Sequence, residues 1–211
     1  QVTLTVGEVG LMLTLTDLAR TSSIADIQTF GTSAGKAVMK KMTSDIAALG
    51  SGFSQSVSST GVALTEANFL AAKSLLTVAD VPAPYYALLY PKQVEHLVAD
   101  TGTTINALGT TGMDVVSQSN QLAVGPSGPE FASLHGVNIV SNSTVPTANA
   151  GADSAGHIAS AGRALAYVEK WGLRVATERD ESLRANEIVV TACYAVGEVD
   201  DASGVSIVTD R

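Results

Sequence analysis

The sequence predicts a mixed α+β fold from three features of its hydrophobic pattern. Apolar and polar residues alternate over residues 1–16, and this two-residue period is typical of a strand. Over residues 24–53 apolar residues recur every three or four positions, which is the period of a helix. Two further strands are indicated near the C-terminus, at residues 173–180 and 187–197.

The composition indicates a sizeable core under a surface with few charges. At 211 residues the chain fits one domain or two small ones, and folding buries roughly 70% of the unfolded surface. Charged residues form 15% of the chain, against about 25% in typical globular proteins. Such a surface is easily desolvated by a neighbour, which favours extensive assembly. A compact acidic monomer fits the composition equally well.

The charge balance and the single cysteine exclude several classes of protein. A net charge of −8 argues against nucleic-acid binding through a basic face. Cys193 stands alone in the apolar run IVVTACYAV, so it has no partner for an intrachain disulfide, and a buried thiol is expected. No apolar stretch approaches the ~20 residues that span a bilayer, so no membrane partner is expected.

The first half of the chain is expected to hold a strand, a long helix and a loop. Gly7 and Gly10 mark an irregularity in the N-terminal strand. Ser23, with Asp26 three residues later, resembles an N-cap for the 24–53 helix. At about 1.5 Å per residue this helix would be roughly 40 Å long. The glycine- and serine-rich residues 50–61 are expected to form a loop.

The middle of the chain reads as a helix, a strand and another helix. Thr65 is expected to cap a helix that the VPAP segment ends. YYALLY, residues 85–90, has the character of a buried strand, and Pro91 is expected to open a helix over residues 91–100. The aperiodic residues 101–112 favour a loop.

The last third is expected to contain short strands and turns. His135 and Gly136 form a turn between two strands, and residues 149–156 are expected to be a loop. GRALAYVEKWG, residues 162–172, predicts a short helix or strand. Short strands are expected at residues 131–134, 137–140 and 204–208.

The sharpest match to a catalytic motif is GTSAG, residues 31–35, which resembles the nucleophile segment of patatin-like lipases. It would make Ser33 a nucleophile if the serine stood on a strand–turn–helix elbow beside an oxyanion hole. However, the pattern is helical on both sides, and the Asp-Gly of those lipases is absent from the sequence. The base would be one of the three histidines, each expected to be an ordinary surface or capping residue: His96, His135 and His157. A serine hydrolase using Ser33 is an alternative function.

No cofactor or metal site is predicted. A metal site needs three or four His, Cys, Asp or Glu residues at ligand spacing. No two of the three histidines lie within helical reach of each other.

The order of elements resembles that of a tailed double-stranded DNA phage major capsid protein, of the Hong Kong ninety-seven coat fold. The resemblance rests on the long helix, on SLHGVNIVSNSTVP at residues 133–146, and on the paired strands in LRVATERDESLRANEIVVTACYAVGEV at residues 173–199. In that family a segment like SLHGVNIVSNSTVP precedes a small strand or helix. Two peripheral strands around a charged turn then follow.

The resemblance implies a division of the chain into three parts. Residues 1–20 correspond to the returning strand of the extended loop. The peripheral domain comprises residues 21–59 and 166–203, with a spine helix at 24–53 and strands at 173–180 and 187–197; the axial domain comprises residues 60–165 and 204–211. The family's N-terminal arm and outgoing loop strand would precede Gln1, and are expected to have been cleaved, disordered or left out.

The function implied is that of a structural subunit without enzymatic activity. Copies of the chain would form pentamers and hexamers of an icosahedral capsid that encloses double-stranded DNA without reading its sequence. Scaffolding, portal and decoration proteins are further implied partners. The chain would be located in the virion, after assembly in the host bacterial cytoplasm. An encapsulin-like nanocompartment shell is the alternative within the same fold.

The charged turn near the C-terminus supplies the candidate inter-subunit contacts. On the strand before it, Leu173, Val175 and Thr177 are expected to face the long helix, and the alternate residues to face away. IVVTACYAV is apolar on both faces and is expected to be buried. A solvated hairpin would explain the charges equally well. The candidate contacts are Arg174, Glu178, Arg179, Asp180, Glu181 and Arg184.

Overall fold

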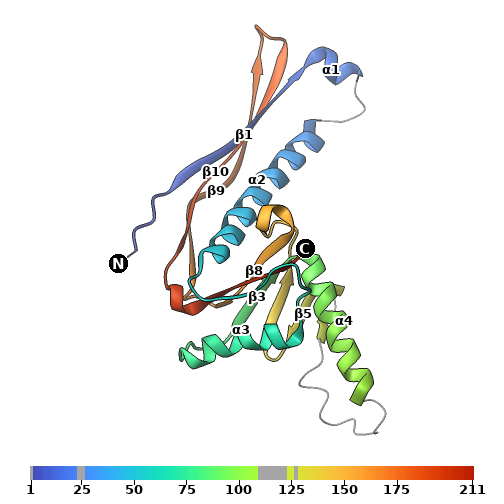
Figure 1. The fold of residues 1–211 in the computed structure, drawn as a ribbon. Coiled ribbons are helices and arrows are strands. Elements are labelled where there is room, and N and C mark those ends of the chain that lie inside the picture. Colours follow the sequence, from blue (N-terminus) through green and yellow to red (C-terminus); the bar gives the residue numbers. More distant parts are fainter. Residues whose placement is uncertain (1, 23–26, 109–122, 126–127) are drawn as a thin grey trace. The chain divides into compact units, whose positions relative to one another are not determined.

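The computed structural model describes residues 2–22, 27–108, 123–125 and 128–211 (Figure 1). Its helices and strands confirm the mixed α+β class. The chain divides into two compact units: unit 1 comprises Gln1–Asp45 and Tyr167–Gly197, and unit 2 comprises Ile46–Ala166 and Glu198–Arg211.

Unit 1 packs a long helix on a three-stranded sheet whose strand order is β1-β10-β9. The central strand β10 pairs antiparallel with β1 from Gly7↔Tyr194 to Thr16↔Ala185. Every second residue of β10 (Ile188, Val190, Ala192 and Tyr194) is buried in a cluster with Ala34 and Val38 of α2. The elements of this unit are β1 (Gly7–Thr16), α1 (Asp17–Ser22), α2 (Ile27–Leu49, continuing into unit 2), β9 (Leu165–Asp180) and β10 (Ala185–Glu198).

A polar contact adds to the apolar packing between α2 and β10. The hydroxyl of Tyr194 donates to Asp45 Oδ2 at 2.7 Å, and Lys41 bonds to the other carboxylate oxygen. Burial raises the pKa of Tyr194 to about 12, with a further contribution from the Asp45 carboxylate. For Asp45, partial burial acts to raise the pKa, but the bonds from Lys41 and Tyr194 outweigh it and lower the pKa.

Unit 2 is built on a larger sheet with strand order β2-β11-β8-β3-β6-β5-β4. The core lies between this sheet and two helices, and includes Phe69, Leu89, Leu97, Ile158 and Ile207. The elements are η1 (Gly50–Gly52), β2 (Ser56–Ser59), α3 (Glu66–Val78), β3 (Tyr85–Leu89), α4 (Pro91–Leu108), β4 (Ala123–Gly125), β5 (Gly128–Leu134), β6 (Val137–Ser141), β7 (Thr147–Ala148), η4 (Asn149–Gly151), β8 (Asp153–Ser160), η5 (Asp201–Ser203) and β11 (Gly204–Asp210).

Several predicted starts and turns are confirmed. Thr65 caps α3, because its Oγ1 accepts a bond from the amide of Asn68 at 3.3 Å. Pro91 is the first residue of α4. His135 and Gly136 have positive φ values of 52° and 76°, as a tight turn between β5 and β6 requires. Cys193 is buried, as predicted for a thiol in an apolar strand.

The long helix and the elements beside it differ from the prediction at their ends. Pairing with β10 begins at Gly7, opposite Tyr194, so the predicted strand over residues 2–6 is wrong: an alternating pattern alone does not make a strand without a partner. The helix ends at Leu49 instead of residue 53, where a 3₁₀ turn over Gly50–Gly52 replaces it. The predicted 50–61 loop contains this turn and β2, which gains its hydrogen bonds from β11. The predicted N-cap, Ser23 with Asp26, lies outside the described residues.

The largest error concerns residues 149–156, which were predicted to be a loop. They form η4 and the first half of β8. That half is hydrogen-bonded to β11 on one side and β7 on the other, and the second half of β8 pairs with β3. The strand was not predicted because Ser, Ala and Gly give little strand signal. The close packing requires such small residues, since a Cβ on Gly156 would lie 2.8 Å from Leu89 Cδ2. Because β8 is buried on both faces, its sequence does not alternate between apolar and polar residues, and it lacks the two-residue period of a half-exposed strand.

Two other elements are longer than predicted. Helix α4 continues through Leu108, so residues 101–108 are helical despite their Thr and Gly content; the rest of that predicted loop lies outside the described residues. Strand β9 is continuous from Leu165 to Asp180, so residues 162–172 are no separate helix. In both cases the structure continues past residues with weak local propensity.

Candidate assembly surface

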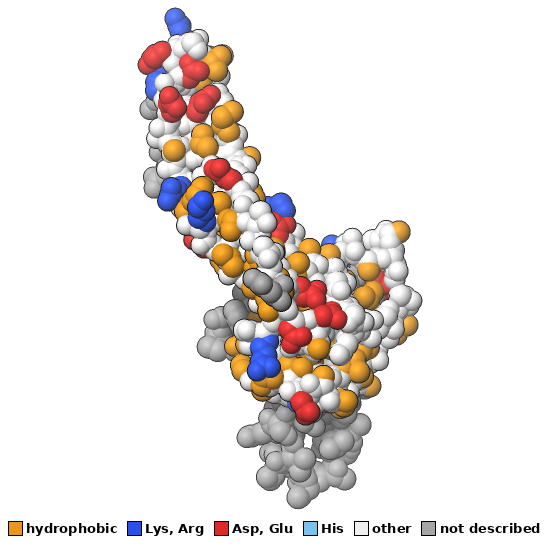
Figure 2. All heavy atoms as spheres, turned by 90° about the vertical axis from the view of Figure 1, so that its left-hand side faces the viewer, with side chains coloured by type: hydrophobic (Ala, Val, Ile, Leu, Met, Phe, Trp, Pro, Cys, Tyr) orange, Lys and Arg blue, Asp and Glu red, His pale blue; other side chains and the backbone are white. Residues whose placement is uncertain are grey.

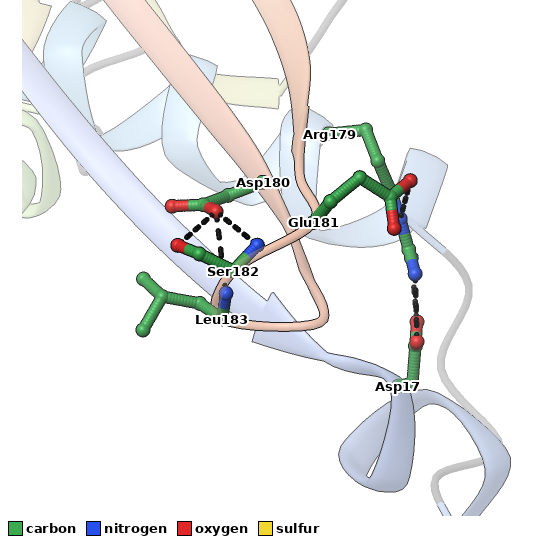
Figure 3. A network of polar contacts seen from close by, with 6 residues as sticks. All are labelled: Asp17, Arg179, Asp180, Glu181, Ser182 and Leu183. Atoms are coloured by element: carbon green, nitrogen blue, oxygen red, sulfur yellow. Dashed lines mark hydrogen bonds and ion pairs between the residues drawn. The ribbon is translucent and has the colours of Figure 1, made fainter.

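The charged turn between β9 and β10 is closed by Asp180. Its Oδ1 accepts hydrogen bonds from the amide of Ser182 at 2.8 Å, the hydroxyl of Ser182 at 2.7 Å and the amide of Leu183 at 3.2 Å (Figure 3). These bonds lower the pKa of Asp180, since they favour its charged form. Asp180 therefore has a structural role within its own chain.

Arg179 is held by Asp17, the first residue of α1. The guanidinium donates two parallel bonds to the carboxylate, Nη1 to Oδ1 at 2.6 Å and Nη2 to Oδ2 at 2.8 Å, while Nε donates to Glu181 Oε1 at 3.2 Å (Figure 3). The amide of Asp17 also donates to the carbonyl of Arg184 at 2.9 Å. The bonds from Arg179 to Asp17 and Glu181 raise the pKa of Arg179. Sequence reasoning missed Asp17, because 162 positions separate it from Arg179.

The other predicted contacts lie on the surface of unit 1. Arg174 lies over the ring of Trp171, 5.1 Å from the centroid, in cation–π geometry. Glu178 and Arg184 are exposed, and their side chains have no partner among the residues that the structure describes. Figure 2 shows acidic and basic side chains gathered at its upper end, where Figure 1 draws the β9–β10 hairpin.

An apolar groove lies between α2 and β9 within unit 1. Leu173, Val175 and Thr177 line it, so the prediction that these residues face the helix is confirmed. The groove has a volume of about 480 Å³, and its wall includes Met39, which is 58% exposed, and Val175, which is 55% exposed. A Cβ on Gly35 would lie 3.3 Å from Leu173 Cδ2, so this glycine permits the close approach of helix and strand.

The GTSAG motif lacks the geometry of a nucleophile elbow. Ser33 lies inside the continuous helix α2, is exposed, and donates its hydroxyl to the carbonyl of Thr29 at 2.9 Å. An elbow requires a strand before the serine and a strained turn at it. The motif therefore arises here from small residues in a helix.

The three histidines all belong to unit 2. His135 lies in the predicted turn, with its Nε2 2.7 Å from Glu66 Oε1, and His96 is half-buried on α4. His157 was expected near the surface after a loop, and this prediction is wrong: it is only 4% exposed, on β8. Among the described residues no group of three or more His, Cys, Asp or Glu is placed to hold a metal ion.

No helix in the described parts of the chain combines the length and the apolar character needed to cross a membrane.

The sequence matches no family model and no curated protein. Solved structures do match. A chain of Mycobacterium phage Che8 aligns with a TM-score of 0.71 at 17% identity, over 95% of this chain and 70% of that one. The acid-stable capsid of Helicobacter pylori bacteriophage KHP30 aligns with a TM-score of 0.70 at 12% identity, over 98% and 76%.

The chain has the Hong Kong ninety-seven coat fold. The predicted resemblance to phage major capsid proteins is thereby confirmed at the level of the fold. The same coat fold accounts for a match to the SrpI encapsulin complex of Synechococcus elongatus, with a TM-score of 0.67 at 12% identity, over 96% of this chain and 73% of that one. The charged turn and the apolar groove thus belong to unit 1 of a coat-fold chain.

Proposed function

We propose that this coat-fold protein is the structural subunit of a tailed-phage capsid, self-assembling into pentamers and hexamers that enclose double-stranded DNA. The observation that carries the proposal is the alignment of 98% of the chain with a phage capsid structure. The exposed apolar groove supports it, because uncovered apolar surface of this kind commonly marks a protein–protein contact. Copies of the same chain are the partners that a closed shell requires.

The proposal assigns the parts of the coat fold to the chain. Residues 1–20, which include β1 and the start of α1, correspond to the returning strand of the extended loop. Residues 21–59 and 166–203 form the peripheral domain, and residues 60–165 and 204–211 form the axial domain. Scaffolding, portal and decoration proteins are further partners, and the chain resides in the virion after assembly in the host cytoplasm.

The charged turn is proposed to set the register between neighbouring subunits. Glu178 and Arg184 are the strongest candidates, because Arg174, Arg179 and Asp180 already contact groups in their own chain. Charged contacts of this kind contribute more to specificity than to affinity. Repeated over a closed lattice, individually weak contacts give a stable shell.

The role is proposed to be structural, without enzymatic activity. The one catalytic motif in the sequence places Ser33 in a regular helix, with its hydroxyl bonded to the carbonyl of Thr29. An esterase assay on the wild type and on Ser33→Ala tests this point. Turnover that depends on Ser33 would contradict it.

An encapsulin-like shell is the second candidate function, because a chain of the SrpI encapsulin complex aligns with 96% of this chain. The two shells differ in their contents. Electron microscopy of particles purified from cells expressing the full-length gene tests for closed shells or capsomer rings. Small monodisperse particles alone would contradict both functions. Nuclease-protected DNA in shells made with the phage packaging machinery supports a capsid, whereas a co-purifying enzyme cargo supports a nanocompartment.

A further inference from the structure

His157 is a buried titratable group that the proposed shell function does not use. It lies on β8, opposite Ser206 of β11 and Leu88 of β3 in the register of the sheet. Its side chain is 4% exposed, and its Nδ1 has no hydrogen-bond partner among the described residues. Burial lowers the pKa of His157 to about 4. A neutral imidazole is therefore enclosed in the sheet of unit 2.

The segment Gly50–Phe53, here called the latch, covers this imidazole. The ring of Phe53 meets the His157 ring edge-on, with centroids 6.0 Å apart. A Cβ on Gly50 would lie 1.8 Å from His157 Nδ1, so the backbone of the latch lies directly against that nitrogen. Water cannot reach Nδ1 while Gly50 keeps this position.

The latch is held in place at its far end. Ser54 donates its amide to Asp201 Oδ1 at 2.8 Å and its hydroxyl to the other oxygen of that carboxylate. The ring of Phe53 packs against Gly204, where a Cβ would lie 2.2 Å from Phe53 Cζ. These contacts belong to unit 2 and hold the end of the latch at Phe53, whereas the end at Gly50 is buried against His157 and continues directly from Leu49 of α2.

Among the described residues, no charged group contributes to the pKa of His157, which burial alone lowers. The register partners Ser206 and Leu88 are uncharged, and the latch contributes only glycine, serine and phenylalanine. Two acidic residues lie beside the latch: Asp201, which binds Ser54, and Glu198, whose Oε2 is 4.0 Å from a Cβ built on Gly52. Burial is the cause of the lowered pKa, with no ion pair to counter it.

We propose that the latch is an acid-sensitive device, in which proton uptake by His157 lifts Gly50–Phe53 from β8. An imidazolium carries two N–H donors that need acceptors or water, and Nδ1 gains access to water only when Gly50 moves away. The latch directly follows the last residue of α2. Its release therefore frees the C-terminal end of that helix in acid.

Hydrogen–deuterium exchange by mass spectrometry on the full chain tests the proposal. The pKa of His157 is about 4 when the latch is closed, and we take its ordinary value of 6.5 when the latch is open. Because protons then bind the open form preferentially, the equilibrium constant for opening rises roughly 30-fold from pH 7.5 to pH 5. We expect this rise in the exchange rates of the backbone amides of Gly50–Phe53, after correction for intrinsic exchange rates. His157→Phe keeps a ring of similar size but cannot titrate, so it should abolish the rise.

Two results would overturn the proposal. One is the same pH response in wild type and His157→Phe. The other is an equal rise in the exchange rates of the Val205 and Ile207 amides, since these residues are fully buried in the core. Such a rise would mean that the whole unit opens in acid.

A matched pair of glycine variants tests the contact itself. Gly50→Ala places a methyl group against His157 and should lift the latch at every pH, so the pKa of His157 should rise towards 6.5. Gly52→Ala changes a residue of the same turn, where the added Cβ would lie no closer than 4.0 Å to any atom, the nearest being Glu198 Oε2. This variant should leave the pKa of His157 near 4. Exchange at the imidazole Cε1–H, followed by mass spectrometry, reports the pKa in assembled and unassembled protein. An unchanged pKa in Gly50→Ala would refute the latch.

Discussion

Arg179 and Asp17 form a fork-to-fork pair, in which the planar guanidinium meets both carboxylate oxygens. Both side chains are part-exposed, at 37% and 44%, so solvent screens the attraction between them. The pair therefore matters for position more than for stability. It fixes the start of α1 against the turn that carries the other charges.

A charge exchange tests this positioning. Arg179→Asp alone places two carboxylates together, and we expect faster hydrogen exchange in the α1 amides with little change in thermal stability. The double variant Asp17→Arg, Arg179→Asp restores the opposite charges and should restore slow exchange. Equal exchange in the wild type and the single variant would show that the pair does not hold α1.

Arg184 is the sharper probe of contacts between subunits, because its side chain has no partner among the described residues. We expect Arg184→Glu to impair assembly, as measured by sedimentation velocity and electron microscopy, while circular dichroism and the melting temperature stay unchanged. Arg163→Glu is the matched control, since it alters the net charge equally at an exposed residue of unit 2. Normal shells from Arg184→Glu, or equal defects from both variants, would contradict a specific role for this residue.

At the scale of elements, β9 and β10 show how one hairpin serves two purposes. β10 is the central strand of the unit 1 sheet and is buried along most of its length, as the sequence predicted for IVVTACYAV. β9 is an edge strand, and most of its side chains are exposed. The central strand carries the packing, and the edge strand presents the groove and the charges.

Packing of α2 on β10 predicts a large effect at Ile188, which is 1% exposed. We expect Ile188→Ala to lower the free energy of unfolding by about 2–5 kcal/mol, because it opens a cavity in the unit 1 core. Val175→Ala on β9 removes a side chain that is 55% exposed, and should change that free energy by less than about 0.5 kcal/mol. Chemical denaturation of the unassembled chain measures both, and equal effects would contradict this division between the strands.

Most elements with a clear hydrophobic period or a local start signal were predictable, although the alternation before Gly7 forms no strand. The helices at Thr65 and Pro91 and the turn at His135 carry local signals in their own side chains and backbone preferences. β8 carries none, because Ser, Ala and Gly are compatible with loops and strands alike. Its identity as a strand depends on β11 and β3, which supply its hydrogen bonds from distant parts of the sequence.

At the scale of the whole molecule, the charge is distributed unevenly between the units. Unit 2 contains eleven of the twenty acidic residues but only four of the twelve basic ones, so it carries most of the net charge of −8. Unit 1 is nearly neutral and carries both signs in its charged turn. Balanced charge suits specific contact between copies, whereas an acidic surface repels DNA phosphates.

His157 makes the stability of the protein depend on pH. Its folded pKa of about 4 lies below the ordinary value of 6.5, so the unfolded chain binds the proton more readily between these values. Stability is therefore full above pH 6.5 and falls as the pH drops towards 4, by up to about 3 kcal/mol. Urea denaturation at a series of pH values should show this slope in wild type and a flatter one in His157→Phe. The same slope in both would contradict the assignment.

The α+β class, the long helix, the buried β10 and the resemblance to the coat fold could all be inferred from the amino-acid sequence. The first three follow from hydrophobic periods, which are properties of neighbouring positions, and the resemblance rests on the order of the elements along the chain. The tertiary structure alone decided that β8 is a strand, that Asp17 binds Arg179 and that His157 lies buried beneath Gly50. Those features arise from contacts between residues far apart in the chain, so the pattern of neighbouring residues does not predict them.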